Sequence, residues 1–407
     1  MSKQNLLINI YNAYYQARKN KRNTKEQLAF EVDHENQLHQ LFEKICAGTY
    51  TVSPSKAFVI EKPVYREIFA PQFIDRVVHH LIAQYIQPQI ELQLIDDAYS
   101  CRKGKGTSYG INRAKYFMRS VTANYAKDAY ILKLDIAGYF MNMNRELLYE
   151  QIKKMKLVES IIGSNFEKNC VEYLLKEVIF SNPTENCTIN GDSSLWKFVP
   201  NNKSLFHSPK NCGLPIGNLT SQLFGNIYLN EFDHWVKNDL GIKHYGRYVD
   251  DMVFMHTDQI VLKQSIEIIT RKLQSYDLQV HPKKIYLQHY TKGVPFLGQY
   301  IKPYRSYISN RTKNNVYILI DEIAHIFKNT AEMNFDLLVN IRSRINSYWG
   351  IFLQANSYNI LKKLMNDLPT SFYQYFYFEK YKTTWKCKLK RSYKLNPNNA
   401  ILQPARI

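Results

Sequence analysis

Residues 246–256, GRYVDDMVFMH, place two adjacent acidic residues between apolar neighbours. The run Met252 to Met255 has the composition of a strand, and strands rarely tolerate two adjacent carboxylates. A tight turn accepts Asp well, so Asp250 and Asp251 are predicted to lie at the tip of a hairpin. The pattern leaves open whether they are turn residues only or ligands of a metal ion.

A third acidic residue follows another apolar segment. Residues 129–140, AYILKLDIAGYF, predict a strand over Tyr130 to Leu134 that runs directly into Asp135. If this strand pairs beside the hairpin, Asp135 comes close to Asp250. Clustered carboxylates repel one another, and a divalent cation relieves the repulsion. Hard oxygen ligands select magnesium or manganese over zinc, and two such ions can bridge a nucleoside triphosphate and a 3′-hydroxyl.

Composition sets the class of partner. The 407 residues carry a net charge of +19, with 45% hydrophobic and 14% aromatic content, which predicts a packed globular chain of two or three subdomains. A globular chain this basic usually binds a polyanion, and nucleic acid is favoured over a membrane surface.

No apolar run of about 18 residues occurs, so we expect no transmembrane helix, and the N-terminus lacks the pattern of a secretory signal. The six scattered cysteines form no CxxC pair, which predicts reduced thiols in a cytoplasmic protein without a zinc site.

Hydrophobic periodicity organises the rest of the chain. Helices are predicted within residues 1–60 and at 75–93, 145–155, 166–178, 219–238 and 261–276. Residues 181–211 are rich in turn formers and indicate an insertion or an irregular β segment. After about residue 310 the pattern predicts helices only. Residues 377–394 mix rings with cations, which fits a nucleic-acid surface and a solvated basic tail almost equally.

Seven motifs follow one another in a fixed order across roughly residues 55–300. They are KPVYREIFAPQFIDRVVHH (62–80), SCRKGKGT (100–107), LKLDIAGYF (132–140, motif A below), LPIGNLTSQLFGNIYLNEFDH (214–234, motif B), YVDDM (248–252, motif C), LQVHPKKI (278–285) and VPFLGQYI (294–301). In this order they resemble the motifs of the reverse transcriptase family. The resemblance implies an α+β right-hand polymerase with fingers, a palm whose antiparallel sheet is backed by helices, and a short helical thumb.

The resemblance also implies a division of the chain into domains. An N-terminal helical extension would cover residues 1–54 and the fingers 55–129. The palm would cover 130–305, with motifs A to E and the insertion at about 181–211. A helical thumb and basic tail would follow over 306–407.

Catalytic roles follow from the match to motifs A and C. Asp135 and Asp250 are the expected metal ligands, and Asp251 shapes the site and contributes to metal binding less directly. The backbone carbonyl of Ile136 would lie beside the ion. Two magnesium ions are expected, with manganese as a possible substitute.

Nucleotide-binding roles come from the flanking motifs. Lys62 and Arg66 match the cations that hold the triphosphate. Phe140 matches the aromatic gate that excludes a ribose 2′-hydroxyl, and Tyr139 replaces it as the candidate if Phe140 belongs to the core.

Further contacts are expected from glycine and lysine positions. Gly217 would let the motif B backbone approach the nucleotide or template closely. Lys283 or its neighbour Lys284 would act as a general acid near the leaving pyrophosphate, although a solvated turn fits these lysines as well.

The basic loop of the second motif also has two interpretations. Arg102, Lys103 and Lys105 resemble a phosphate or template contact, and a plain basic turn fits them equally.

The histidines do not indicate a metal site. His79, His80 and His281 lack metal-ligand spacing and are interpreted as structural or surface residues.

Motif B departs from the common family pattern. Most members carry Gln where this chain has Ile216, and Gln222 stands in place of the usual proline. Together with VPNNKSLF at 199–206, this pattern is similar to the reverse transcriptases of diversity-generating retroelements. That likeness implies copying of a template RNA into error-prone cDNA from deoxynucleoside triphosphates, with frequent errors at template adenines. It also implies a small basic accessory protein as partner and a place for Ile216 next to the nascent base pair.

Two other functions stay open. One is an antiphage or otherwise domesticated bacterial reverse transcriptase, of group II intron-like or retron-like type. The other is a catalytically silent nucleic-acid scaffold. Asp135 and Asp250 argue against the scaffold, because a scaffold needs a basic surface and no central pair of acids.

Overall fold

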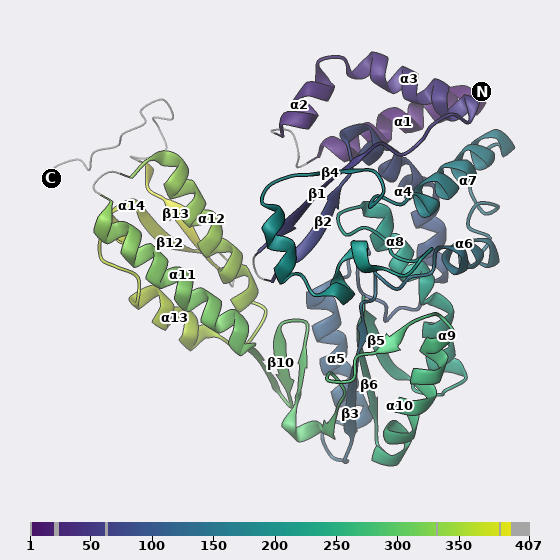
Figure 1. Ribbon diagram of the computed structural model, residues 1–407. Helices are drawn as coiled ribbons and strands as arrows, with labels where there is room; N and C mark the ends of the chain where they lie inside the picture. The colour runs from purple at the N-terminus through teal and green to yellow at the C-terminus, as the bar shows by residue number, and fades with distance from the viewer. Residues whose placement is uncertain (1, 20–23, 62–63, 331–332, 382–383, 392–407) are drawn as a thin grey trace. The chain divides into compact units, whose positions relative to one another are not determined.

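The computed structural model describes residues 2–19, 24–61, 64–330, 333–381 and 384–391 (Figure 1). These residues form two compact units, which we describe separately. The first contains Met1–Gly110 and Tyr130–Leu287, and the second contains Ile111–Ala129 and Gln288–Ile407.

An antiparallel sheet forms the centre of the first unit. Its strands follow the order β5 (His244–Tyr248), β6 (Asp251–His256), β3 (Tyr130–Ala137) and β7 (Gln279–Val280), and β8 (Tyr286–His289) also pairs with β3. Apolar side chains such as Leu132 and Phe254 are fully buried on these strands, as the apolar runs in the sequence predict.

Helices cover this sheet. Helix α10 (Gln259–Gln274) contacts β3, β6 and β7, and α9 (Asn230–Asn238) contacts β5 (Figure 1). The single helix predicted over 219–238 is two helices, α8 (Leu219–Tyr228) and α9. They meet at Leu229, whose φ of −107° and ψ of 10° lie outside the helical region.

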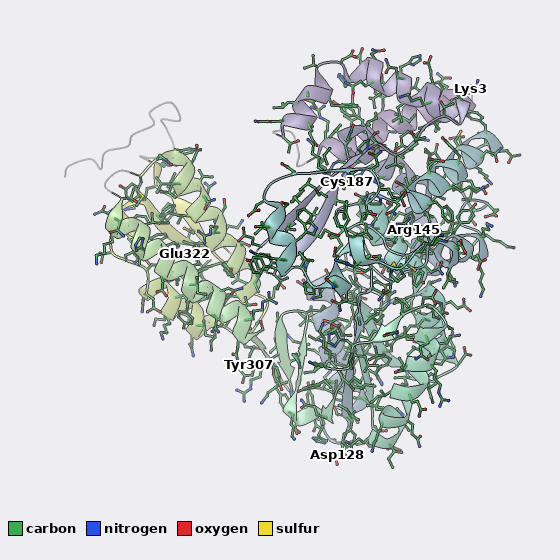
Figure 2. All side chains as sticks on the ribbon, in the orientation of Figure 1. Lys3, Asp128, Arg145, Cys187, Tyr307 and Glu322 are labelled. Carbon is green, nitrogen blue, oxygen red and sulfur yellow. The ribbon has the colours of Figure 1, made fainter. Side chains whose placement is uncertain are left out.

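A smaller sheet carries the predicted fingers. Strand β1 (Ser55–Ile60) pairs antiparallel with β2 (Arg66–Ala70), and β4 (Cys187–Ile189), which includes the Cys187 labelled in Figure 2, pairs with β1 in parallel. The remaining helices of this unit are α1 (Ser2–Arg18), α2 (Lys25–Glu31), α3 (His34–Ala47), α4 (Phe73–Gln93), α6 (Arg145–Lys154) and α7 (Asn165–Phe180), with short 3₁₀ helices at Ser193–Phe198, Asn201–Lys203 and Leu205–His207.

The turn-rich segment 181–211 is tied to the smaller sheet by one buried carboxylate. Glu67 on β2 accepts hydrogen bonds from Trp196 Nε1 and Ser204 Oγ, both at 2.7 Å, and from the Leu205 amide at 2.6 Å. Three donors satisfy a charge that burial would otherwise make costly. The predicted insertion therefore packs against the smaller sheet rather than forming a separate loop.

The second unit combines a small sheet with helices. Strands β9 (Val294–Phe296), β10 (Gln299–Lys302) and β11 (Arg305–Ile308) form an antiparallel sheet. The other elements are the part of α5 (Thr107–Val121) from residue 111, a 3₁₀ turn at Tyr290–Lys292, α11 (Asn310–Asn329), α12 (Phe335–Phe352), α13 (Tyr358–Asn366), α14 (Phe372–Tyr375), β12 (Phe376–Tyr381) and β13 (Thr384–Leu389).

The hairpin β12–β13 corrects the prediction that the chain is wholly helical after residue 310. Phe376, Cys387 and Leu389 are buried in the core of this unit, where the Trp349 ring of α12 stacks on Phe378. Their alternation along each strand is the period of two that a half-buried strand requires. Of the basic tail, residues 392–407 lie outside the described residues.

Two further sequence predictions concern membranes and cysteines. Over the described ranges, no helix is both long enough and apolar enough to cross a membrane. The six cysteines are free thiols.

Buried histidines make the free energy of unfolding depend on pH. His79 on α4 is 2% exposed, lies 2.9 Å from Thr220 Oγ1, and burial lowers its pKa to about 3. Burial likewise lowers the pKa of His80 to about 4. Between these values and the ordinary pKa of about 6.5, the unfolded chain binds protons that the folded chain does not, so stability falls as the pH falls.

We therefore expect the wild type to lose stability between about pH 7.5 and pH 5, with His79 contributing about 2 kcal/mol of the loss. His79→Asn should be less stable at neutral pH yet lose less on acidification, because Asn binds no proton. Urea unfolding at the two pH values measures the difference. His39→Gln, at an exposed position, should keep the wild-type pH dependence. If the pH dependence of stability is the same in His79→Asn as in the wild type, His79 binds its proton equally well in the folded and the unfolded chain, which contradicts this account.

Candidate active site

The three predicted acids meet at one end of the central sheet. In the antiparallel register of β3 and β6, Asp135 lies opposite Asp251. Asp250 occupies the turn between β5 and β6, and its carbonyl accepts a hydrogen bond of 3.2 Å from the Ile136 amide. Directly after β7, the His281 amide donates to the Asp135 carbonyl at 2.7 Å. The predicted hairpin is present, although Asp251 is the first residue of a strand and not part of the turn.

Burial and mutual repulsion perturb these carboxyl groups. Burial raises the pKa of Asp250 to about 6, with the neighbouring Asp135 as the next largest cause. Burial also raises the pKa of Asp251, although the Lys133 ammonium opposes the rise. A nearby cation stabilises the ionised form of carboxyl groups whose pKa is raised in this way.

Two lysines supply positive charge in the structure. Lys284 Nζ lies 2.8 Å from both carboxylate oxygens of Asp135, and Lys133 Nζ lies 2.9 Å from Asp251 Oδ1. The neighbouring Lys283 is exposed, and its amide donates to the His281 ring. Of the two lysines considered for the general acid, Lys284 is therefore the one beside the acids.

The donor set fits a hard divalent cation. Carboxylate oxygens are ligands that magnesium prefers, and both burial and the neighbouring Asp135 charge raise the pKa of Asp250, so a cation would stabilise its ionised form. Within the described part of the chain, no three His, Cys, Asp or Glu side chains are grouped closely enough to hold a metal as they stand. Asp135 and Asp251 are instead each paired with a lysine, Lys284 and Lys133 respectively.

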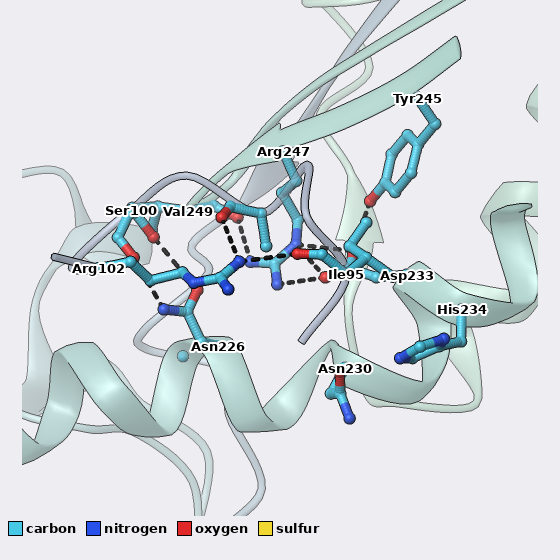
Figure 3. Close-up of polar contacts among 12 residues, drawn as sticks. Ile95, Ser100, Arg102, Asn226, Asn230, Asp233, His234, Tyr245, Arg247 and Val249 are labelled. Atoms are coloured by element: carbon cyan, nitrogen blue, oxygen red, sulfur yellow. Dashed lines mark hydrogen bonds and ion pairs between the residues drawn. The ribbon is translucent and has the colours of Figure 1, made fainter. Parts of the chain in front are cut away.

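A buried ion pair holds the turn that carries Asp250. Arg247 on β5 and Asp233 on α9 are 1% and 0% exposed, and Arg247 donates to both Asp233 oxygens at 2.6 to 3.1 Å (Figure 3). A further Arg247 N–H donates to the Val249 carbonyl at 3.1 Å, and Tyr245 Oη donates to Asp233 at 2.6 Å. Val249 has a φ of 56°, which a β-branched residue rarely adopts. The Arg247 bond thus helps to hold the turn in an unfavourable conformation.

Neither Arg247 nor Asp233 was predicted as a site residue. The signal in the sequence is an arginine between aromatic residues in HYGRY (244–248), and an acid that directly follows an aromatic residue in NEFDHWVKN (230–238). Burial lowers the pKa of Arg247, but Asp233, Tyr139 and Tyr245 together outweigh burial and leave the pKa raised.

The two gate candidates differ in burial. Tyr139 is 3% exposed and its hydroxyl donates to the Gly225 carbonyl, so it belongs to the core. Phe140 is only half-buried and packs against both the main core and the small apolar cluster of the fingers. This position keeps Phe140 as the candidate gate.

The start of motif B is pressed against β2. The Phe69 amide donates to the Ile216 carbonyl at 3.0 Å. Gly217 has a φ of 128°, and a Cβ there would lie 2.9 Å from the Phe69 carbonyl oxygen, so only glycine fits without strain. Buried Arg145 (labelled in Figure 2) donates to the Gly213 carbonyl at 3.1 Å and holds the other end of this segment. The structure shows a close approach of Gly217 to the β2 backbone, and its predicted approach to the nucleotide or template stays a prediction.

Two of the three predicted loop cations bind within the protein. Arg102 donates to Glu91, Ile95 and Ala98 at 2.7 to 2.9 Å and is almost completely buried. Lys105 pairs with Asp96 at 2.7 Å.

The remaining predicted cations lie on the surface or beyond the described residues. Lys103 in the loop and Arg66 at the start of β2 are exposed. Lys62 lies outside the described residues.

Comparisons with known proteins identify the family. The model described as "Reverse transcriptase (RNA-dependent DNA polymerase)" matches residues 28–301. The chain therefore belongs to the reverse transcriptase family, and the α+β polymerase fold predicted from the motifs is confirmed. Members of this family generally use divalent metal ions.

Several solved structures are similar to the chain. Apo telomerase from Candida tropicalis truncated from its C-terminal domain has a TM-score of 0.47 and 14% identity, covering 63% of this chain and 55% of that one. Telomerase from Candida albicans with a TWJ fragment of telomeric RNA has a TM-score of 0.45 and 12% identity, covering 84% and 60%. The chain thus spans less than two thirds of the length of these telomerase chains. No curated protein matches the sequence.

Proposed function

We propose that this reverse transcriptase copies a template RNA into error-prone cDNA within a diversity-generating retroelement. The observation that carries the proposal is Ile216, which stands where most members of the family have a glutamine amide. The Ile216 side chain is half-buried beside the cluster that contains Phe69 and Leu205, so this position offers shape and apolar surface but no hydrogen bond. Weaker selection of the correct base pair suits an enzyme that diversifies its product.

Asp135 and Asp250 would hold the divalent cations, with the Ile136 carbonyl beside them and Asp251 contributing less directly. Two magnesium ions, or manganese in their place, would supply charge stabilisation between the triphosphate and the primer 3′-hydroxyl when bound. Lys284 would have to release Asp135 for this, because it contacts both carboxylate oxygens.

Other side chains of the site would orient the nucleotide and move its proton. Arg66, together with Lys62, would hold the triphosphate, and Gly217 would keep the Ile216 backbone close to the nascent pair. Lys284 holds protons 2.8 Å from the Asp135 oxygens and would donate one near the leaving pyrophosphate. The partners would be a structured template RNA, the cDNA, deoxynucleoside triphosphates and a small basic accessory protein.

Phe140→Ala should admit ribonucleotides, because the ring that blocks the 2′-hydroxyl is removed. We expect discrimination against ribonucleotides to fall at least about tenfold, the equivalent of ~1.4 kcal/mol in the transition state. Single-nucleotide incorporation from each triphosphate measures the ratio. Tyr139→Phe keeps its buried ring and should retain the wild-type ratio. Unchanged discrimination in Phe140→Ala would make Phe140 a packing residue only.

Ile216→Gln tests the proposed role most directly. The restored amide should reduce misincorporation opposite template adenines by roughly tenfold, with a smaller effect on total synthesis. Sequencing of cDNA from a defined RNA template gives both quantities. Ile216→Leu keeps the apolar surface without an amide and should retain the wild-type error rate. An adenine error rate that is the same in Ile216→Gln and Ile216→Leu would refute this role for Ile216.

A further inference from the structure

A basic cavity lies in the second unit, which shares no residue with the candidate active site. Its volume is about 540 Å³, and it is lined by residues of α5, the loop after α5, the β10–β11 hairpin and the loop after α12. The lining consists of four cations, three tyrosines and three asparagines, and none of these described residues is acidic.

The cations come from two separate segments of the chain. Lys115 and Arg119 lie one helical turn apart on α5, and Lys302 and Arg305 flank the turn between β10 and β11. In the described part of the chain, no carboxylate lies within ion-pair distance of these four side chains. Burial lowers the pKa of the Lys115 ammonium, so a bound anion would restore an interaction that water no longer supplies. Four convergent cations without acids favour a ligand with more than one phosphate.

Tyrosine rings stand beside these cations. Tyr304 is 81% exposed, and its ring centroid lies 4.3 Å from that of Tyr125. Tyr125 also stacks on Tyr290 at 6.2 Å, and Tyr290 donates its amide to the Ala129 carbonyl at 3.0 Å. Tyr125, itself supported by Tyr290, therefore contacts the Tyr304 ring on one side, while the rest of the ring stays open to solvent. Contact of the open ring face with water is unfavourable, and a partner that covers the face removes it. A nucleobase is a partner with a matching flat surface.

The backbone fixes both rings in place. Ala123, Asn124 and Tyr125 have φ values of 48°, 61° and 70°, and Tyr304 has a φ of 63°. Left-handed conformations are rare for residues other than glycine and persist where the surrounding structure holds them. The loop after α12 adds rigidity, because the Asn356 side chain accepts a 3.0 Å hydrogen bond from the Ser306 amide on β11.

We propose that this cavity binds an unpaired segment of nucleic acid, with a base stacked on Tyr304 and the flanking phosphates on the four cations. A base-paired helix hides its base faces and would not offer this contact, so the site selects single strands. Asn112 and Asn124 are exposed beside the rings and can bond base edges or a ribose 2′-hydroxyl. The inference rests on the proposed function only for the identity of the strand, which would then be part of the template RNA not being copied.

The test uses the full chain carrying Asp250→Asn, with unlabelled template–primer present in excess to fill the active site. Fluorescence anisotropy measures binding of a labelled unpaired RNA of about 12 nucleotides, within the site sizes of about 4–16 known for stacking grooves. Tyr304→Ala should weaken binding roughly tenfold, and Tyr304→Phe should restore it. The double variant Lys302→Ala/Arg305→Ala should flatten the salt dependence, by about 0.7 in logarithmic slope for each phosphate that the cavity no longer neutralises.

Controls and opposing outcomes separate this site from general basic charge. Tyr358→Ala and Lys362→Ala remove an exposed ring and an exposed cation on α13, and they should leave binding unchanged. A DNA strand of the same sequence shows whether the 2′-hydroxyl contributes, and binding of either strand supports the site. Equal affinity of Tyr304→Ala and wild type, or equal binding of unpaired and fully paired RNA, would overturn the proposal. Neither result depends on catalysis, so failure of the proposed function would appear separately.

Discussion

Asp250→Asn should abolish RNA-templated primer extension, with a rate loss well beyond the roughly 10–100-fold that follows removal of an outer partner of a metal ligand. The substitution takes one negative charge from a pair of carboxylates on adjacent elements, and the remaining Asp135 is already paired with Lys284. Asn has nearly the shape of Asp, and burial already raises the pKa of the Asp250 carboxyl to about 6. We therefore expect no loss of folding stability, which thermal unfolding of the same preparation checks.

Two substitutions calibrate this result. Asp135→Asn should be as inactive as Asp250→Asn, because both carboxylates are expected to hold the same cations. Asp367→Asn removes an exposed acid at the end of α13 and should extend primers at the wild-type rate. A well-folded Asp250→Asn chain with near wild-type extension would remove the catalytic assignment from this turn.

Asp233→Asn should destabilise the first unit by about 3–5 kcal/mol, the cost of breaking a buried ion pair on one side. The Arg247 guanidinium would stay buried without its carboxylate, and Tyr245 would lose its charged acceptor. Primer extension should fall as well, because Arg247 holds the Val249 carbonyl next to Asp250. Urea unfolding and single-turnover extension measure the two effects.

The double variant Asp233→Leu/Arg247→Met separates stability from positioning. Apolar replacement of both charges should recover most of the lost stability, since buried ion pairs contribute little net free energy. Extension should remain impaired, because no donor is left for the Val249 carbonyl. If Asp233→Asn is as stable as the wild type, the pair does not hold the turn.

The sequence predicted the central sheet well because its signals are local. Apolar runs before Asp135 and after Asp251 indicate two strands, and the acids at the ends of these runs are expected to lie together if the strands pair. The order of the motifs indicated the reverse transcriptase family, and the match to the family model confirms it. The domain boundaries, the metal ligands and the nucleotide contacts remain predictions.

What the sequence missed depends on tertiary packing. Arg247 and Asp233 lie on different elements, and no spacing rule pairs a strand arginine with a helix acid. The sequence alone could not choose between Lys283 and Lys284, because the choice depends on which side of β7 and the following turn faces Asp135. Arg102 resembles a ligand-binding residue in a basic loop, yet the backbone carbonyls of Ile95 and Ala98 occupy it.

The hairpin β12–β13 was missed for a related reason. Its rings and cations resemble a solvated tail when counted by composition, whereas their alternation buries Phe376 and Leu389 in a separate core. Composition alone does not report which residues share a face.

Sequencing of cDNA made by the purified chain from a defined RNA containing all four bases tests the central claim most directly. With magnesium and deoxynucleoside triphosphates, and with Asp250→Asn as the blank, we expect full cDNA whose errors concentrate opposite template adenines. Accurate cDNA, or errors spread evenly over the four template bases, would contradict the diversity-generating role. Equal product from the wild type and the blank would contradict the active site itself.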